Sequence, residues 1–166
     1  MLDDSHIHVR PMEMGDFEFI RGLASQQPNF TVPSFYMLWL FMRIKGSICL
    51  VAEHNAKGTL AYLLAVPIEG VGKSIFIWQL SVTELKEPNA GIVAILQEFH
   101  KRILALGVDR LLFSTIVDSP IYRLIRRYAW DLARLVPQKL NPLPPAIGGD
   151  ESEFLLRLDP SHRGSQ

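Results

Sequence analysis

One stretch of this chain carries the clearest structural signal: Ile75-Phe76-Ile77-Trp78-Gln79-Leu80-Ser81-Val82. Its β-branched and aromatic side chains predict a buried strand. Downstream the apolar period becomes helical, and Gly107 supplies a C-terminal stop after Ile92, Ile95, Leu96, Phe99, Ile103 and Leu106. Arg110–Val117 is expected to be the next strand, so residues 75–117 predict a β-α-β unit with parallel strands.

Two apolar runs, Ile48–Glu53 and Thr59–Val66, precede this unit. The connection between them, residues 54–58, contains Asn and Gly, which suit a hairpin turn. Consecutive strands with short polar turns predict an antiparallel meander. Gly72-Lys73-Ser74 resembles the end of a phosphate-binding loop, but it precedes a strand instead of opening a helix, so we interpret it as a hairpin turn.

The N-terminal part predicts a short strand followed by two helices. His6–Arg10 alternates in polarity, and Asp16 is expected to cap a helix with an apolar stripe formed by Phe17, Ile20 and Ala24. The second predicted helix, Phe35–Met42, is apolar all round. Its side chains have three open roles: core, lining of an acceptor pocket, or a homodimer contact. Core is the default interpretation.

The C-terminal part continues the alternation. Ser119 as N-cap and Pro120 at the first helical position predict another helix. A weak strand signal at 132–136, a loop rich in proline and glycine at 137–149 and a last strand at 153–158 follow. The order predicts an α+β fold whose mixed sheet, an antiparallel meander and then a parallel β-α-β unit, is flanked by helices. We expect one domain over residues 1–159 and a disordered tail over 160–166.

Composition argues against several classes of partner. The 166 residues include 17 basic and 17 acidic side chains, so no overall charge favours nucleic acid. Arg43 and Lys45 interrupt the longest apolar stretch, so we expect no membrane span and no membrane partner. His6 and His8 lack the Cys, Asp or Glu cluster that would complete a metal site. Cys49, the only cysteine, lies in an apolar run, which predicts a buried thiol and a cytoplasmic setting.

The element order and three local stretches resemble the GNAT superfamily of acyl-CoA-dependent N-acetyltransferases. The stretches are Ser34–Leu38, Val51–Glu53 and Phe76–Val82, and their nearest likeness is to the diaminobutyrate acetyltransferases of ectoine synthesis. The resemblance covers residues 7–130 approximately. It implies the GNAT fold, acetyl-CoA or another acyl-CoA as cosubstrate, and a primary amine as acceptor.

The resemblance places acyl-CoA on the fourth strand and the loop that follows it. The pantetheine arm would lie along the strand edge at Leu80, Ser81 and Val82, with the pyrophosphate on backbone N–H groups where the central helix begins. The further residues implied are Lys86, Asn89, Ala90, Gly91, Ile92 and Asp118. The loop departs from the family pattern, because Pro88 has no N–H group and because Ile92, or Val93 in the alignment shifted by one residue, occupies a position where the family has a small residue.

The family's usual general acid is a tyrosine in the helix after the fifth strand. Ile125 holds that position here, and Tyr122, three residues earlier, is the nearest replacement; it serves equally as a tyrosine that packs beside the sheet. No carboxylate lies on residues 75–82, so the expected base is a water held by Gln79, Ser81 or Thr115, with Glu53 more remote.

By the resemblance, Ser34 and Tyr36 would lie closest to the acceptor amine, and Trp78 and Thr115 are also expected near it. Trp78 serves equally as a core residue. The resemblance implies an enzyme that transfers an acyl group, by direct attack in a ternary complex, to an amine of a small molecule or amino acid. The alternative is a GNAT-fold protein that has lost catalysis and serves as a binding or regulatory subunit. The altered loop and the missing tyrosine motivate this alternative.

Overall fold

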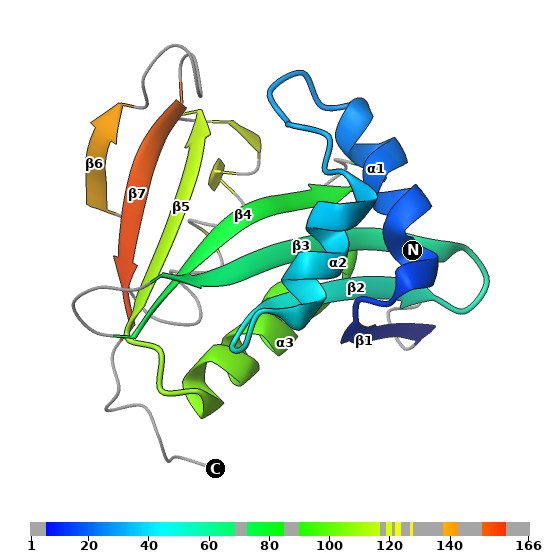
Figure 1. Cartoon of the computed structure of the whole chain (residues 1–166), viewed down its shortest axis with the longest axis horizontal. Helices are drawn as coiled ribbons and strands as arrows, with labels where there is room; N and C mark the ends of the chain where they lie inside the picture. Colours follow the sequence, from blue (N-terminus) through cyan, green and yellow to red (C-terminus); the bar gives the residue numbers. More distant parts are fainter. Residues whose placement is uncertain are drawn as a thin grey trace. The chain divides into compact units, whose positions relative to one another are not determined.

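The computed structural model of this chain (Figure 1) describes residues 6–68, 73–84, 90–116, 119–120, 122–123, 127, 138–142 and 151–158. The chain forms two compact units, Met1–Val66 with Gln79–His100, and Pro67–Trp78 with Lys101–Gln166. Strand β4 (Ser74–Val82) and helix α3 (Ala90–Ala105) each run through both units. The single domain over residues 1–159 stays a prediction, and the predicted tail lies outside the described residues.

Antiparallel strands form the frame of the first unit. β1 (Ile7–Pro11) pairs with β2 (Ile48–His54), and β2 pairs with β3 (Gly58–Ile68). The Thr83 N–H donates to the Leu60 carbonyl at 2.9 Å, so the end of β4 lies beside the beginning of β3. The predicted antiparallel pairing of β2 with β3 is confirmed.

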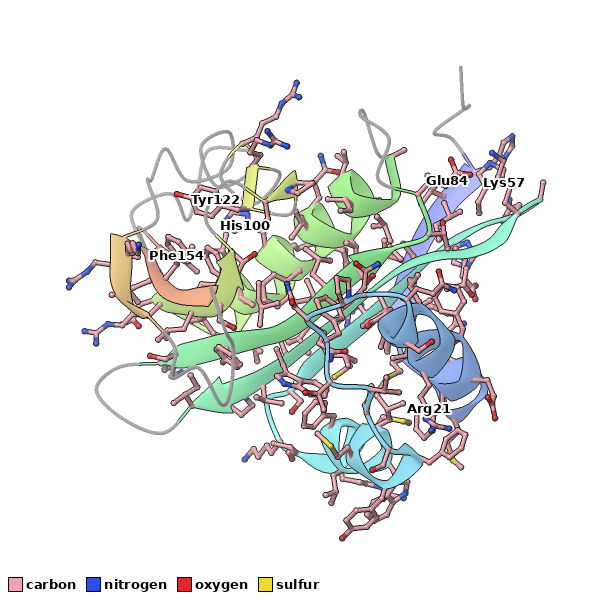
Figure 2. The ribbon with its side chains drawn as sticks, turned by 90° about the horizontal axis from the view of Figure 1, so that it is seen from above. Arg21, Lys57, Glu84, His100, Tyr122 and Phe154 are labelled. Carbon is pink, nitrogen blue, oxygen red and sulfur yellow. The ribbon has the colours of Figure 1, made fainter. Side chains whose placement is uncertain are left out.

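Helices cover both faces of these strands (Figures 1 and 2). α1 (Phe17–Ser25) and α2 (Phe35–Arg43) lie on one face, and the first part of α3 lies on the other. The predicted stripe of α1 is buried, at Phe17, Ile20 and Ala24. No helix within the described ranges is both long and apolar enough to cross a membrane.

The predicted N-cap position of Asp16 is confirmed, but its side chain does not cap the helix. Asp16 ends a short 3-10 turn, Met14–Asp16, and stands at the N-cap of α1, but its side chain makes no capping hydrogen bond to that helix. Instead its carboxylate accepts hydrogen bonds from the Glu13 N–H and from the Arg10 guanidinium. The nearby cation and the turn geometry direct the side chain toward β1.

The interpretation of α2 as core is wrong for most of the helix. Leu38 is fully buried, at 0% exposure, but Tyr36 is 67% exposed and Phe35 is 44% exposed. Trp39 and Met42 also belong to the exposed large apolar side chains. A helix that rests on a sheet buries only the side turned toward that sheet. An all-round apolar helix therefore leaves aromatic side chains in solvent.

The second unit contains a mixed sheet. The first part of β4 pairs in parallel with β5 (Arg110–Ile116), from Ser74 opposite Arg110 to Ile77 opposite Phe113. β5 then pairs antiparallel with β7 (Glu151–Arg157). The predicted α+β fold with a parallel β-α-β unit and a last strand is confirmed.

β6 (Gln138–Pro142) lies where the sequence predicts only a loop. It pairs antiparallel with β7, and Pro142 stands at its end. Proline suits an edge strand, where one side makes no ladder bonds. The composition of the segment therefore concealed a short edge strand, and the strand signal at 132–136 lies outside the described residues.

α3 ends where the sequence predicts. Gly107 has a φ of 71°. The Gly107 and Val108 N–H groups donate to the carbonyls of Leu104 and Ile103, which is a Schellman motif. Leu106, predicted to continue the apolar stripe, lies beyond the last helical residue and is exposed, because the chain already turns there.

Candidate functional site

The second half of β4 carries the residues on which the predicted site depends most. Gln79, Leu80, Ser81 and Val82 are all buried. The Gln79 amide oxygen accepts a hydrogen bond from the Tyr62 hydroxyl at 3.0 Å, and its amide nitrogen donates to the Thr31 carbonyl at 2.7 Å. Both ends of this amide are therefore engaged by the protein. The predicted role of Gln79 in holding a water stays a prediction.

The start of α3 is the expected pyrophosphate site. The first turn of the helix carries no acidic side chain. Gly91 is buried, and Ile92 is 0% exposed, so its branched side chain packs inward. The first N–H groups of a helix lack intrahelical partners, and they favour anions. Lys86, Asn89 and Asp118 lie outside the described residues.

Ser34 and Tyr36, the predicted acceptor residues, stand at the start of α2. The Ser34 hydroxyl accepts a hydrogen bond from the Met37 N–H at 3.1 Å and so caps the helix. The Tyr36 ring stacks on the Trp39 ring with their centroids 6.0 Å apart. The role of Ser34 as a cap explains its place in the sequence, and an acceptor contact at either residue stays a prediction.

Two arginines lie against aromatic side chains of α2, and sequence reasoning missed them. The Arg21 guanidinium lies 4.5 Å from the centre of the Phe35 ring, and its Nε donates to the Pro33 carbonyl at 3.0 Å (Figure 2). The Arg43 guanidinium lies 5.2 Å from the centre of the Trp39 ring. The sequence did indicate a cationic region here, because no Asp or Glu occurs between Glu18 and Glu53.

In the second unit, Thr115 and Tyr122 are joined through one side chain. The hydroxyls of Thr115 and Ser119 share a hydrogen bond of 3.0 Å, and the Ser119 hydroxyl accepts from the Tyr122 N–H at 3.0 Å. Ser119 is thus the N-cap that the sequence predicts. Trp78, the remaining predicted acceptor residue, is half-buried on β4.

The Tyr122 ring is a packed side chain. It is 8% exposed, and its centre lies 4.9 Å from that of Phe154 (Figure 2). Phe154 in turn stacks on Phe113 with ring centres 5.4 Å apart. This surrounding favours the packing role that the sequence left open, and the general-acid role of Tyr122 stays a prediction.

A charged cluster ties β1 and β2 to the start of α1. Two nitrogens of Arg10 donate to the two carboxylate oxygens of Asp16, each at 2.7 Å. Arg10 also donates to Glu53, and the second Glu53 oxygen lies 3.1 Å from His8 Nε2. Sequence reasoning missed this cluster, although the strand register places His8 opposite Glu53.

The cluster lowers the pKa values of both carboxyl groups. Burial alone would raise the pKa of Asp16, but the hydrogen bonds from Arg10 and from the Glu13 N–H outweigh it and lower that pKa. The hydrogen bond from Arg10 lowers the pKa of Glu53. A carboxylate bound by a guanidinium is a weaker base. The structure thus gives Glu53 a binding role within the cluster and little basicity.

Cys49 on β2 is buried, as predicted, and burial raises the pKa of its thiol to about 11. The thiol is therefore protonated and unreactive near neutral pH. Cys49 is accordingly a packing residue.

No family profile matches this chain, and no protein of curated function matches its sequence. Several solved structures share its fold. The dodecameric spermidine N-acetyltransferase of Vibrio cholerae is 14% identical, with 98% of this chain and 99% of that chain covered and a TM-score of 0.70. A GNAT-family acetyltransferase of Streptococcus pneumoniae is 11% identical, with 92% and 99% covered and a TM-score of 0.67.

A third similar structure is the NatC complex bound to Gag peptide and CoA, with 14% identity, 93% of this chain and 99% of that chain covered and a TM-score of 0.70. Such likenesses, at low identity, establish architecture. The chain therefore has the fold of the GNAT N-acetyltransferases, as the sequence predicts. The finer likeness to diaminobutyrate acetyltransferases stays a prediction.

Proposed function

We propose that this protein is an acyl-CoA-dependent N-acyltransferase that transfers an acetyl group to the primary amine of a small molecule. The observation that carries the proposal is the β4–α3 unit. β4 pairs with β5 from Ser74 to Ile77 and continues to Val82, and the helix that follows begins with an uncharged first turn. This unit supplies strand backbone for an amide-containing arm and helix N–H groups for a pyrophosphate.

The residues of the unit fit acyl-CoA. Backbone groups of Leu80, Ser81 and Val82 would hold the pantetheine arm. Ala90 and Gly91 are small enough for phosphate oxygens to approach the helix N–H groups. Because Ile92 is fully buried, its branched side chain packs away from the solvent at the helix start. Lys86 and Asn89, which precede α3 in the sequence, and Asp118, which follows β5, would also contribute.

The proposed reaction is a direct transfer. The neutral amine nitrogen attacks the thioester carbon, the new C–N bond forms and the C–S bond breaks. The amine gives its proton to a water held by Ser81 or Thr115, and the CoA sulfur receives a proton from the Tyr122 hydroxyl. Gln79 is not assigned the water in this proposal, because its amide oxygen already bonds to Tyr62 and its amide nitrogen to the Thr31 carbonyl.

The acceptor proposed is an amino acid or another amine with an anionic group. Ser34 and Tyr36 belong to a region whose charged residues between Glu18 and Glu53 are all cationic: Arg21, Arg43 and Lys45. A carboxylate complements these cations, whereas a polyamine would be repelled by them. Trp78 and Thr115 complete the proposed acceptor residues.

The alternative function is a catalytically inactive GNAT-fold subunit that binds or regulates a partner. The packing of the Tyr122 ring against Phe154 favours it, because a ring held in a core serves stability without catalysis. A homodimer and a cytoplasmic setting stay predictions under either function.

Calorimetric titration of the protein with acetyl-CoA tests the first step. We expect binding in the micromolar range, and Ala90→Asp should weaken it on the order of tenfold, since it places a negative charge beside the pyrophosphate. Gln97→Asp, an exposed change on the same helix, is the matched control and should bind normally. No heat up to millimolar acetyl-CoA would remove the enzyme proposal.

Release of free CoA thiol with candidate acceptors tests the second step. We expect turnover with a free diamino acid and less with spermidine at the same concentration. Binding of acetyl-CoA without turnover of any amine would favour the inactive subunit. Preference for spermidine would contradict the proposed acceptor class and leave the acyltransfer intact.

A further inference from the structure

A chain of two hydrogen bonds, one buried and one partly buried, connects strand β3 to the segment between α1 and α2. Tyr62 on β3 is 0% exposed, and Gln79 on β4 is 4% exposed. The Tyr62 hydroxyl donates to the Gln79 amide oxygen, and the Gln79 amide nitrogen donates to the Thr31 carbonyl. Thr31 itself is exposed, so these two hydrogen bonds connect an exposed segment to the buried side chain of Tyr62. We call the pair of bonds the tie.

The direction of these bonds fixes the orientation of the Gln79 amide. The Thr31 carbonyl can only accept, so the nitrogen end of the amide must point toward it. The amide oxygen then points toward Tyr62, whose hydroxyl donates to it. If the Tyr62 hydroxyl were absent, the amide oxygen would lose its partner in a buried site, and this position of the amide would be held less firmly. Tyr62 thus acts on Thr31 through Gln79.

The tie acts on the segment that carries the predicted acceptor residues. Residues 30–34 have no regular secondary structure and lead directly into α2. A second side-chain bond to this segment runs from Arg21 to the Pro33 carbonyl. Ser34 then starts α2, with its hydroxyl bonded to the Met37 N–H and its carbonyl bonded to the Leu38 N–H.

We propose that Tyr62 and Gln79 are positioning residues, which set the conformation of residues 30–34 and thereby the placement of Ser34 and Tyr36. The statement about the segment stands on the hydrogen bonds alone. Its consequence for acceptor binding rests on the proposed function. Buried polar networks of this kind specify one arrangement more than they add stability.

Hydrogen exchange of three amides measures the tie without any substrate. The Phe30, Met37 and Leu38 N–H groups are bonded to Gln27 or Ser34, at the two ends of the segment. Tyr62→Phe keeps the ring and removes the donor. We expect exchange at these three amides to rise roughly three- to tenfold, with cleavage by chymotrypsin after Phe30 faster in the same proportion.

Leu63→Val is the matched control, because Leu63 is the buried neighbour of Tyr62 on β3 and takes no part in the tie. Leu63→Val should lower the melting temperature without a selective rise in the exchange rates of the three amides. An equal rise in Leu63→Val and Tyr62→Phe would overturn the proposal, because the loosening would then follow from stability alone. Wild-type exchange in Tyr62→Phe would overturn it as well.

Gln79→Glu separates the two bonds of the tie. A carboxylate still accepts from Tyr62, but it cannot donate to the Thr31 carbonyl and repels it. At pH 7 we expect the three amides to exchange faster than in the wild type at the same pH. On acidification this difference from the wild type should disappear, since a protonated carboxyl group regains a donor. A merely structural defect would show no such recovery, so its absence would count against the proposal.

Kinetics then tests the consequence for the acceptor. Tyr62→Phe should raise the acceptor KM about three- to tenfold while the KM for acetyl-CoA stays unchanged. An inactive wild-type protein would remove the proposed function, but the exchange and proteolysis results would still decide whether the tie exists. Equal changes in both KM values would contradict a role specific to the acceptor.

Discussion

Helices α3 and α2 are both rich in apolar side chains, yet they are attached to the first unit in different ways. In α3 the side chains of Ile92, Ile95 and Phe99 are at most 2% exposed. In α2, Leu38 is the buried residue, and large aromatic side chains face solvent. Apolar content alone therefore does not determine burial; the period of the apolar positions does.

Polar ties accompany the weaker burial of α2. The region from Glu13 to Arg43, which we call the α1–α2 arm, is held to β1 by the Arg10–Asp16 pair and to β4 by Gln79 on the Thr31 carbonyl. Within the arm, Arg21 bonds to the Pro33 carbonyl. Hydrogen bonds and ion pairs depend on geometry and pH more sharply than apolar burial does. The attachment of the arm should therefore depend on pH and geometry more than the attachment of α3 does.

Truncation of α3 should have the largest effect. Phe99→Ala should lower the free energy of unfolding by about 3–5 kcal/mol, because it leaves a cavity in the core. Urea denaturation followed by circular dichroism measures this loss, and Gln97→Ala, an exposed neighbour, is the control. A loss below about 1 kcal/mol would mean that α3 is not the apolar anchor that its burial indicates.

Two adjacent changes in α2 sharpen the contrast. Leu38→Ala should cost about 2–4 kcal/mol, since the side chain is fully buried. Trp39→Ala removes a larger side chain that is 37% exposed, and we expect a cost of about 1 kcal/mol or less. Melting temperatures of the two variants rank the effects. If Trp39→Ala melts at a lower temperature than Leu38→Ala, the exposed face of α2 must be covered in solution.

The same contrast between α3 and α2 explains which parts of the fold could be predicted from the sequence. α3 and its Gly107 stop were predicted because the period of the apolar residues and the glycine at its end agree. The exposure of α2 was missed because an all-round apolar sequence carries no period. β6 was missed because proline and glycine dominate its segment.

The candidate site was predicted only in part, for a physical reason. Residue types suggested Gln79 and Tyr122, but neither composition nor spacing reveals that Tyr62 bonds to Gln79 or that Tyr122 packs on Phe154. Such partners are distant in sequence. The Arg10–Asp16–Glu53 cluster escaped for the same reason, since it joins a strand, a turn and a second strand.

The charged tie of the arm should have a smaller, pH-dependent effect. Asp16→Asn should cost about 1–3 kcal/mol at pH 7, because Arg10 loses a bidentate partner. The folded-state pKa of Asp16 is lowered, so its contribution is present above the unfolded pKa of about 4 and is lost as pH falls through the folded pKa.

Chemical denaturation between pH 7 and pH 2 measures this dependence. The gap in unfolding free energy between wild type and Asp16→Asn should narrow as pH falls below about 4. Glu18→Gln, an exposed change of equal charge on α1, is the control and should show no such narrowing gap. A gap that stays constant down to pH 2 would contradict the ion-pair origin of the tie.

The smallest expected effect is a gain in stability, and it tests whether helix formation or the polar ties limit the arm. Gly22 lies inside α1, and a Cβ at this position would meet no heavy atom within 4 Å. Gly22→Ala should therefore stabilise the protein by about 0.5–1 kcal/mol. Gly58 has equally open space but a φ of 75°, so Gly58→Ala should destabilise by about 1 kcal/mol. If thermal melting shows the loss at Gly58 and no gain at Gly22, the polar ties set the stability of the arm, and a better helix adds nothing to it.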